Sequence, residues 1–537
     1  MSFPLFQLKS LKIHNGNFAV IKVASMYQSW LSGDFLGRWT PAIIQGYGYP
    51  SFNYYAPFFF YLSSAISIIV HHLVLGFNLG LFVTLFVSGC TMFLYTKEFW
   101  GAEGAFLSAV AYLLIPYHIV DLYIRGATGE LVVFALLPLF FWAVYRLSNE
   151  PKIAYFLISS LCFAALITAH NVMAMLLVPL IFAYFIFVLI QKRFETRYMV
   201  LLGGVFVFAF GIAAYFWLPV LLERGYIQIE RDVMGAFSYA NHFVYWDQLL
   251  YSPWGFEGSV PGRNDFMSFQ IGPVHLVLLF LFLIRINCIR QQKLSNQRVV
   301  IFWIVVMFFA IFMTLEISNF IWKALPPLAF LQFPWRFLLF VAFTVSFLVG
   351  GVCCSLKKYP QLRVALICSV LVFAANISYC RPLTYEDLHI QNPRQFLYES
   401  YPMDNMEYLP IDVKALSFTP PENKIEIKSG DGQVLDYKNE RDLSYTYKFQ
   451  ANTPVEVFFH SFYFPGWEVF INHQRVEILR DNPFGLISFN IPKGEQLINV
   501  VFKSTLVRTV GELISFIFLM GWVVIFIFRK KIDGRSW

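Results

Sequence analysis

Charged residues are scarce in this chain of 537 residues, and their scarcity excludes most soluble folds. Only 14% of the residues are Asp, Glu, Lys or Arg, whereas 58% are hydrophobic and the mean hydropathy is +0.59. Soluble domains carry about a quarter charged residues. The composition therefore predicts a polytopic α-helical membrane protein. The formal net charge of +7 does not indicate nucleic-acid binding, because Lys and Arg gather in short loops between apolar runs.

Cysteine motifs, internal repeats and a cleavable leader are also missing. The seven cysteines lie mostly inside apolar runs, and none follows Cys380. Their spacing excludes a disulfide framework and a zinc site, so cysteine does not decide the compartment. No repeat with a period of about 20–50 residues is visible, and no secretory signal with a cleavage site.

Long apolar runs dominate what is present. Runs of about 17–22 residues are long enough to cross a bilayer. A further run, 56–75, is interrupted at its entry by Pro50 and Pro57, and we expect it to lie in the membrane interface without crossing fully. The expected spans lie near 79–96, 104–120, 130–148, 153–169, 172–190, 199–219, 271–288, 298–316, 336–355, 362–379 and 509–528.

The loops orient this set of spans. Basic loops belong on the cytoplasmic side, and here they are 191–197, 285–298, 356–363 and the tail 529–535. The remaining connections, 121–130, 220–270, 322–335 and 380–508, are then expected outside. This topology predicts a multi-pass plasma-membrane protein with a cytoplasmic C-terminus.

The stretch from about 415 to 508 changes character. Segments such as "VEVFFHSFYF" and "WEVFINHQRVEIL" alternate apolar and polar residues between Gly, Pro and Asn turns. That pattern predicts a small antiparallel β-sandwich outside the membrane, tethered by the final span. The expected organisation is a first loop with interfacial helices (1–78), a multi-span bundle (79–380), an extracytoplasmic segment (381–508), and a last span with a basic tail (509–537).

The stretch 37–62, "GRWTPAIIQGYGYPSFNYYAPFFFYL", is too aromatic and too often broken by proline for an ordinary span. An aromatic belt at the interface is one explanation. A belt does not require Gly46 and Gly48 between tyrosines, however, and small residues let a backbone approach a ligand closely. We therefore favour a binding surface that includes Arg38, Trp39, Tyr47, Tyr49, Tyr54 and Tyr55.

Four ionisable residues stand beside the expected spans. Asp121, Arg125 and Glu130 share one short loop, and ionisable residues at membrane depth are functional by default. Solvation of an interfacial turn is the alternative. Arg336 follows "LQFPW" at the start of a span, where it would face either a ligand or, as a snorkelling anchor, the headgroups.

Residues 13–62 resemble the start of a prokaryotic family known as the 6-pyruvoyl-tetrahydropterin synthase-related membrane proteins. Nothing in the chain is typical of a pterin-binding fold, so no pterin chemistry is inferred from that label. The resemblance covers essentially the whole chain and extends to "DLYIRGATGE" (121–130), "EYLP" (407–410), "FYFPGWEVFINHQRV" (462–476) and "FKSTLVRTVGELIS" (502–515).

The arrangement is also similar to the integral-membrane glycosyltransferases of the GT-C-like fold, which use polyprenyl-phosphate sugars. This resemblance implies a lipid-linked sugar donor, a glycan or protein acceptor, and contact with membrane lipids but not with nucleic acid. It also implies a catalytic acid after a His in the first outer loop, where this chain has His14 and Asn15. A span is expected ahead of that loop, and only 13 residues precede His14.

These observations leave the enzyme assignment open. A glycosyltransferase acting at the outer face is the first hypothesis, a non-catalytic lipid- or glycan-binding protein is the second, and a transporter ranks last. No metal ligands are identified, and a requirement for a divalent cation stays open. The candidate catalytic residues are His14, Asn15, Asp121 and Glu130. Arg125 and Arg336 join the aromatic stretch as substrate-binding candidates, and we expect Arg38, Tyr54, Asp121, Arg125, Glu130 and Arg336 to converge on one outward cavity.

Overall fold

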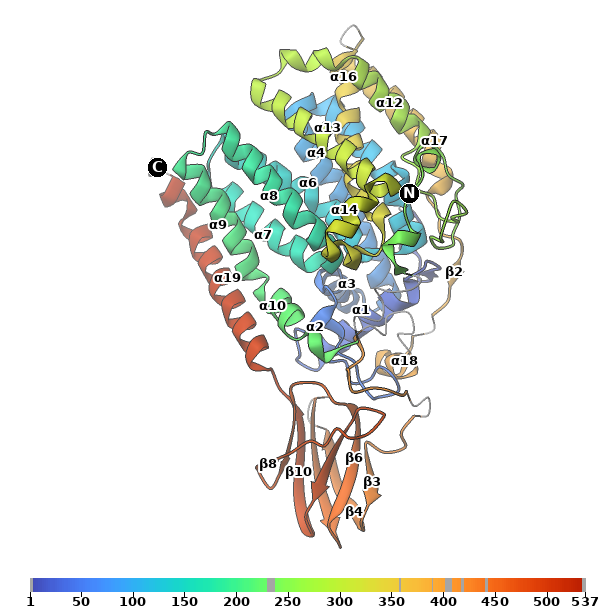
Figure 1. Cartoon of the computed structure of the whole chain (residues 1–537), viewed down its shortest axis with the longest axis vertical. Coiled ribbons are helices and arrows are strands. Elements are labelled where there is room, and N and C mark those ends of the chain that lie inside the picture. Colours follow the sequence, from blue (N-terminus) through green and yellow to red (C-terminus); the bar gives the residue numbers. More distant parts are fainter. Residues whose placement is uncertain are drawn as a thin grey trace.

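The computed structural model describes residues 3–228, 237–356, 359–388, 390–400, 408–416, 420–439 and 443–533. Within these ranges the chain forms a bundle of apolar helices, a β-rich domain beyond one end of it, and a last long helix that returns along the bundle (Figure 1). Among the described residues, seven helices are long and apolar enough to cross a membrane, and a bent pair of helices brings the number to as many as eight. The predicted fold class of a polytopic helical bundle with a C-terminal β-rich region is confirmed, while the side of the membrane on which that region lies stays a prediction.

The helices of the bundle account for every expected span. Two expected spans, α7 and α12, are shorter apolar helices. The bounds are α4 (Leu73–Leu114), α5 (Pro116–Val120), α6 (Thr128–Asn149), α7 (Ile153–Ala169), α8 (Asn171–Gln191), α9 (Thr196–Ile212), α10 (Ala214–Leu222), α11 (Trp246–Leu250), α12 (Pro273–Ile284), α13 (Leu294–Thr314), α14 (Asn319–Ala324), α15 (Leu338–Val349), α16 (Gly351–Ser355), α17 (Gln361–Asn376) and α19 (Leu506–Asp533).

The helix α4 contains two spans. Gly101 has a φ of 72° and a ψ of −175°, which interrupts the helical path. A Cβ built on Gly89 would lie 2.9 Å from the Leu113 side chain, whereas 24 residues of straight helix would separate these positions by about 36 Å. The chain therefore reverses at Gly101. The separate runs predicted at 79–96 and 104–120 agree with this reversal.

The run predicted as one span at 199–219 is broken. The axes of α9 and α10 differ by 70° across Ala213. The backbone groups freed at this break find partners elsewhere, which explains why the break is tolerated in an apolar helix. The Tyr215 N–H donates to Ser515 Oγ at 2.7 Å, and the Tyr215 carbonyl accepts from Arg38 Nη2 at 2.9 Å.

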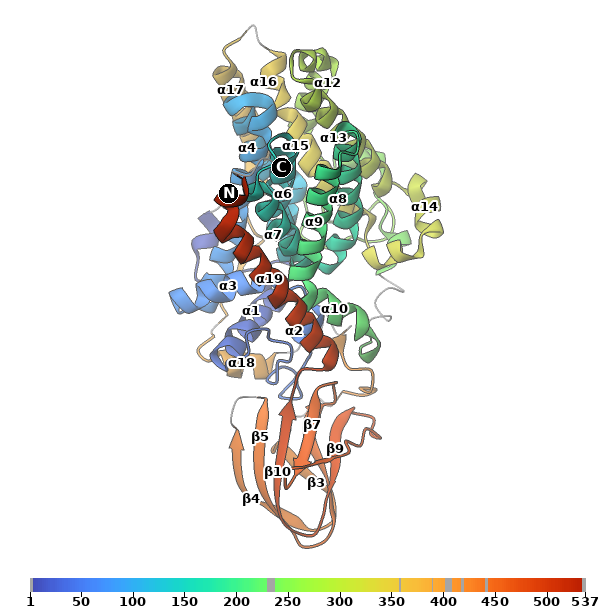
Figure 2. The same cartoon turned by 90° about the vertical axis from the view of Figure 1, so that its left-hand side faces the viewer.

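The N-terminal segment forms α1 (Gly16–Leu31), α2 (Ser51–Tyr54) and α3 (Phe58–Val70) at the end of the bundle near the β-domain (Figure 2). The helix α3 ends at His71, whose φ is 53°, and folds back on α4. A Cβ on Gly76 would clash with Ser67, so glycine permits the close approach of the two helices. The 13 residues of α3 extend about 20 Å, less than the roughly 30 Å of a hydrocarbon core. That this run does not cross stays a prediction.

The β-domain consists of two antiparallel sheets. One has the strand order β4-β5-β10-β7-β8 and the other β3-β6-β9. Inward-facing rings join the sheets, because Phe459 of β6 lies 5.1 Å from Tyr445 of β5 and 5.9 Å from Trp467 of β7. The strand bounds are β3 (Ile425–Ser429), β4 (Gly432–Asn439), β5 (Ser444–Ala451), β6 (Val455–Phe462), β7 (Trp467–Ile471), β8 (Gln474–Val476), β9 (Leu486–Ile491) and β10 (Gly494–Phe502); β1 (Ser10–Leu11) pairs with β2 (Tyr385–Glu386) outside this domain.

Candidate functional site

Four charged side chains from three separate segments meet at the N-terminal ends of α6 and α15. Asp121 and Arg125 begin and end a π-helical turn, η2 (Asp121–Arg125), that continues α5. Glu130 lies in the first turn of α6, and Arg336 belongs to the short helix η10 (Pro334–Phe337) ahead of α15. We call these four residues the Arg125 cluster.

The turn that carries Arg125 depends on a glycine. Gly126 ends η2 with a φ of 63°, a conformation that L residues rarely adopt. A Cβ at this position would also lie 2.6 Å from the Ile13 side chain. The Gly of "RGATGE" therefore lets the chain reverse so that Arg125 and Glu130 face each other.

Arg125 is the centre of the cluster. Its Nη1 donates to Glu130 Oε2 at 2.9 Å and its Nη2 to Glu130 Oε1 at 2.7 Å, a bidentate pair, and Nη1 also contacts Asp121 Oδ1. Arg336 Nε lies 3.4 Å from Glu130 Oε1, while its Nη1 donates to the Leu331 carbonyl at 2.6 Å. Charge-assisted bidentate pairs of this kind hold both partners in a fixed orientation.

Three further side chains surround the cluster. The Tyr117 hydroxyl donates to Glu130 Oε2 at 3.0 Å and lies 3.2 Å from Arg125 Nη1. Trp335 lies beneath the Arg125 guanidinium at 4.4 Å, a cation–π contact. His170, between α7 and α8, has its Nε2 4.0 Å from Glu130 Oε1. Burial lowers the pKa of His170, so its ring is neutral at pH 7.

The protonation of Asp121 sets the charge of this site. Asp121 and Glu130 are completely buried, and Asp121 Oδ2 has no hydrogen-bond partner in the described ranges. Burial, with the neighbouring Glu130 carboxylate, raises the pKa of Asp121 well above its ordinary value. A protonated Asp121 leaves two guanidinium groups against one carboxylate, a net charge of +1. An ionised Asp121 makes the cluster neutral.

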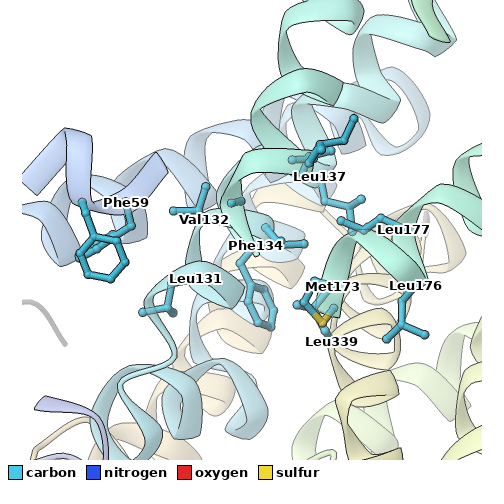
Figure 3. Packing of buried hydrophobic residues seen from close by; sticks show 14 of the residues in the cluster. Phe59, Leu131, Val132, Phe134, Leu137, Met173, Leu176, Leu177 and Leu339 are labelled. Carbon is cyan, nitrogen blue, oxygen red and sulfur yellow. The ribbon is translucent and has the colours of Figure 1, made fainter. Parts of the chain in front are cut away.

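An apolar core holds the three helix ends together. Each of the site residues Glu130, His170 and Arg336 precedes a buried residue three or four positions further on, namely Phe134, Met173 and Leu339. Figure 3 shows these three side chains converging between α6, α8 and α15. The site therefore rests on a packed layer. Side chains held this way keep catalytic groups in a fixed geometry.

The backbone of His14 and Asn15 lies beside the Arg125 cluster. The His14 N–H donates to the Ile124 carbonyl at 2.8 Å, and the Asn15 N–H donates to the Arg125 carbonyl at 3.1 Å. The His14 ring is exposed, and its Nε2 lies 2.8 Å from the Phe256 carbonyl oxygen. Asn15 precedes α1 and makes no side-chain cap to it. The position at which the resemblance implies an acid is thus adjacent to Arg125.

Arg38 and Tyr54 do not contact the Arg125 cluster. Of the six residues expected to converge, four do so, and the structure places Arg38 and Tyr54 in another set of contacts. Arg38 Nη2 pairs with Glu512 Oε1 at 2.9 Å, and Arg508 Nε pairs with Glu223 Oε2 at 2.9 Å. The Tyr54 hydroxyl donates to the Glu223 carbonyl at 2.7 Å. Arg38, Glu223, Arg508 and Glu512, which we call the clamp, join the first loop to α10 and α19.

The aromatic side chains of the first loop are packed inside the protein. Trp39 is fully buried between Phe464, Trp467 and Phe502 of the β-domain, at ring distances of 5.7, 6.0 and 5.7 Å. Tyr47 stacks on Phe462 at 5.4 Å. These rings join the loop to the β-domain. Their assignment to substrate binding stays a prediction.

The remaining tyrosines surround a buried lysine. Tyr49 and Tyr55 place their rings 5.2 and 4.9 Å from Lys22 Nζ, and Phe18 and Phe52 complete the enclosure at 4.9 and 5.7 Å. The "GYGYP" run fits this packing because a Cβ on Gly48 would lie 2.6 Å from the Trp39 ring. Within the described ranges no group of three or more His, Cys, Asp or Glu side chains could hold a metal ion.

Sequence reasoning missed Tyr117, His170 and Trp335. A signal was available for His170, because "HN" (170–171) interrupts two apolar runs at the end of the bundle where "DLYIRGATGE" lies. Tyr117 precedes Asp121 by four residues, one helical turn, which places the two side chains on one face. Trp335 directly precedes Arg336.

The chain is similar to known membrane proteins. The family model of the 6-pyruvoyl-tetrahydropterin synthase related domain, described as a membrane protein, matches residues 52–381. A curated relative, an uncharacterized protein of Lactococcus lactis subsp. cremoris strain MG1363, is 24% identical over 336 residues, which are 60% of this chain and 52% of the relative. The chain thus spans about half the length of that protein.

Two solved structures of the Archaeoglobus fulgidus oligosaccharyltransferase are similar to part of the chain. The apo form has a TM-score of 0.42 at 13% identity and covers 70% of this chain and 52% of the neighbour. The complex with Zn and sulfate has a TM-score of 0.39 at 13% identity, with coverages of 71% and 51%.

Proposed function

Since this chain belongs to the 6-pyruvoyl-tetrahydropterin synthase-related family of membrane proteins, we propose that it binds a polyprenyl-phosphate-linked sugar at the outer face of the membrane and transfers the sugar to a glycan or protein acceptor. The observation that carries this proposal is the Arg125 cluster. Buried ionisable groups at membrane depth are costly and are retained for function. Here three of them lie within ten positions of one another, and the fourth, Arg336, joins them from 206 positions after Glu130.

The two arginines suit a lipid phosphate. Guanidinium groups bind phosphate through charge-assisted, frequently bidentate hydrogen bonds. With Asp121 protonated the cluster carries one net positive charge, which a phosphate monoanion would balance. Arg125 and Arg336 keep about a tenth of their side-chain surface exposed. A ligand would approach them through this small exposed fraction.

The two carboxyl groups then take different roles. Glu130 orients both arginines, whereas Asp121 Oδ2 is free to accept a proton. In the proposed reaction Asp121 first loses its proton to solvent, and the ionised carboxylate then takes the proton of the acceptor hydroxyl as the hydroxyl oxygen attacks the anomeric carbon. The bond from that carbon to the phosphate oxygen breaks, and the phosphate leaves with the electron pair, stabilised by Arg125 and Arg336. A raised pKa makes the ionised Asp121 a stronger base than an ordinary carboxylate.

The positions of the basic loops agree with a reaction at the outer face of the membrane. Figure 1 places the α8–α9 turn, the start of α13 and the C-terminal end of α19 at the end of the bundle opposite the β-domain, and these segments carry the basic loops. The positive-inside rule then puts the β-domain outside. Cysteines introduced as Glu495→Cys and Lys293→Cys, in a background without the exposed Cys90, test this with an impermeant reagent on whole cells. Labelling of the second site alone would reverse the orientation.

A non-catalytic lipid- or glycan-binding protein is the second candidate, and Asn15 favours it. Its backbone adjoins Arg125, so the resemblance would place an acid next to the cluster. The deciding experiment is a thin-layer assay of the full chain with radiolabelled polyprenyl-phosphate sugars. Release of polyprenyl phosphate by the parent chain supports transfer. Donor binding without turnover by both the parent and Asn15→Asp would assign the chain to the second class.

A further inference from the structure

A second site lies at the other end of the bundle. A cavity of about 140 Å³ opens between α6, α8 and α13, and Tyr145, Asn149, Gln191, Lys192, Ser295 and Arg298 contribute to its wall. We call it the distal pocket. Asn149 follows Glu130 by 19 residues of α6, so the pocket lies about 30 Å from the Arg125 cluster. The proposed transfer reaction gives it no role.

The charge of the distal pocket is positive and unbalanced. Lys192 and Arg298 line it, no Asp or Glu does, and neither side chain forms an ion pair in the part of the chain that the structure describes. Some basic residues nearby are paired, because Arg146 contacts Glu98 at 3.2 Å and Lys152 contacts Glu150 at 3.0 Å. Lys192 Nζ instead lies 5.0 Å from the Tyr198 ring. Lys192 and Arg298 are thus the two cations that line the cavity, and no carboxylate of its wall balances them.

The partial charges at the ends of α6, α8 and α13 reduce the positive charge of the distal pocket only in part. The C-terminal ends of α6 and α8 direct carbonyl groups toward the pocket, whereas the first turn of α13 presents N–H groups. Each helix end is equivalent to roughly half a charge, so two negative ends and one positive end leave about −0.5 against two full positive charges. The Asn149 and Gln191 side-chain amides add hydrogen-bond donors.

The surface next to the pocket is apolar. Leu294, Ile301 and Val305 are exposed along α13, and Ile301 and Val305 follow Arg298 by three and seven positions, so they share its face of the helix. The helix α13 is long and apolar enough to cross a membrane, and this face leads from the pocket along the helix. A cationic head site continuous with an apolar track fits an amphiphile with an anionic head.

We propose that the distal pocket binds the phosphate group of an anionic membrane phospholipid. A water molecule occupies roughly 30 Å³ in the liquid, so the cavity has room for one phosphate group with some of its hydration. Lys192 and Arg298 contact the phosphate oxygens, and the acyl chains follow the exposed apolar face of α13. The ammonium group of a zwitterionic lipid would be repelled by the same two cations.

Native mass spectrometry of the full-length chain, reconstituted with phosphatidylglycerol or phosphatidylcholine, tests this proposal. We expect the parent to retain one phosphatidylglycerol molecule at least tenfold longer than phosphatidylcholine. The double variant Lys192→Gln/Arg298→Gln should lose this preference. The control Arg193→Gln/Arg290→Gln removes the same charge from exposed positions at the same end of the bundle, and it should behave as the parent does.

Two further measurements complete the test. One distinguishes a phospholipid from inorganic phosphate as the occupant, and the other covers the case in which the double variant does not fold. Inorganic phosphate at millimolar concentration should not displace the lipid; displacement by phosphate alone would keep the anion site but overturn the lipid as its occupant. The single variant Arg298→Gln changes an exposed side chain and should fold, so its lipid retention is read if the double variant does not express. Equal retention of both lipids by the parent, or equal losses in the pocket and control variants, would overturn the proposal.

Discussion

Two buried charge clusters lie at the same end of the bundle and use similar side chains in different ways. The Arg125 cluster pairs two arginines with Asp121 and Glu130, and the clamp pairs two arginines with Glu223 and Glu512. In the clamp every Glu223 carboxylate oxygen is used, because Oε2 accepts from Asn53 and Arg508 and Oε1 from Thr505. In the Arg125 cluster Asp121 Oδ2 accepts nothing in the described ranges.

The difference indicates what each cluster does. The clamp joins the first loop, α10 and α19, and both carboxylate oxygens of Glu223 are used, although Nη1 and Nη2 of Arg508 have no hydrogen-bond partner in the described ranges. The Arg125 cluster differs in leaving a buried carboxyl oxygen unpaired, and a carboxyl group in this state is a candidate for proton transfer to or from a ligand. Substitutions in the clamp should therefore change stability, and those in the cluster should change function.

The largest expected effect is the loss of turnover in Asp121→Asn. Removing a general base slows turnover by about 10²–10⁴-fold, while the amide keeps the shape of the side chain. Thin-layer detection of the released polyprenyl phosphate measures it. The apparent Tm should stay near that of the parent, and a variant with unchanged turnover would remove Asp121 from the mechanism.

Glu223→Ala should cause the largest loss of stability. It leaves the fully buried Arg508 without its carboxylate, and breaking a buried pair in this way costs about 3–5 kcal/mol. Unfolding in detergent, followed by tryptophan fluorescence, measures the change. Glu512→Ala is the comparison variant: the Glu512 side chain is 35% exposed, and without it Arg38 keeps its hydrogen bonds to Asn53 Oδ1 and the Tyr215 carbonyl, so the loss should be smaller than in Glu223→Ala. Equal losses would contradict the description of the clamp.

Trp39→Ala should loosen the contact between the first loop and the β-domain. Replacing a buried Trp by Ala costs about 3 kcal/mol or more, and Trp39 contacts three rings of the β-domain. Limited proteolysis should then cut the loop near residue 40 sooner than in the parent. Trp30→Ala, which removes a half-buried ring stacked on Tyr61 at 5.9 Å, should have a smaller effect.

A smaller effect is expected from pH. Below the raised pKa of Asp121 the cluster has a net charge of +1, and above it the charge is zero, so donor affinity should fall about three- to tenfold as pH rises through that pKa. Turnover should rise over the same range, because the base must be ionised. Titration of donor binding over the whole pH range in which the protein stays folded measures this, and Asp121→Asn should flatten the dependence of affinity on pH. A slope that persists in the variant would assign the titration to another group.

The sequence predicted those parts of the structure that follow from local pattern. Alternation between 415 and 508 predicted the two sheets, and the shared loop of Asp121, Arg125 and Glu130 predicted their contact. Arg336 was placed beside them because alternating spans return it to the same end of the bundle. The spans themselves follow from hydropathy, although the 70° bend at Ala213 has no sequence signal beyond small residues.

Pairings between distant single residues could not be predicted. Glu223 and Arg508 are 285 positions apart and neither belongs to a periodic motif. The burial of Trp39 and Tyr47 against the β-domain was missed for a similar reason. An aromatic ring buries well in a domain interface or against a sugar, and composition alone does not distinguish these surroundings.

The comparison between the two clusters is tested most directly by donor affinity in a matched pair of arginine variants. Equilibrium binding of a labelled polyprenyl-phosphate sugar to the full chain would be measured for the parent, Arg336→Gln and Arg38→Gln. Losing a hydrogen bond to a charged phosphate costs about 1.5–3 kcal/mol, so Arg336→Gln should weaken binding by about 10- to 150-fold. Arg38→Gln should leave donor affinity within about twofold of the parent, because its guanidinium serves the clamp. Equal affinities in all three proteins, or a larger loss in Arg38→Gln, would contradict the assignment of the Arg125 cluster as the donor site.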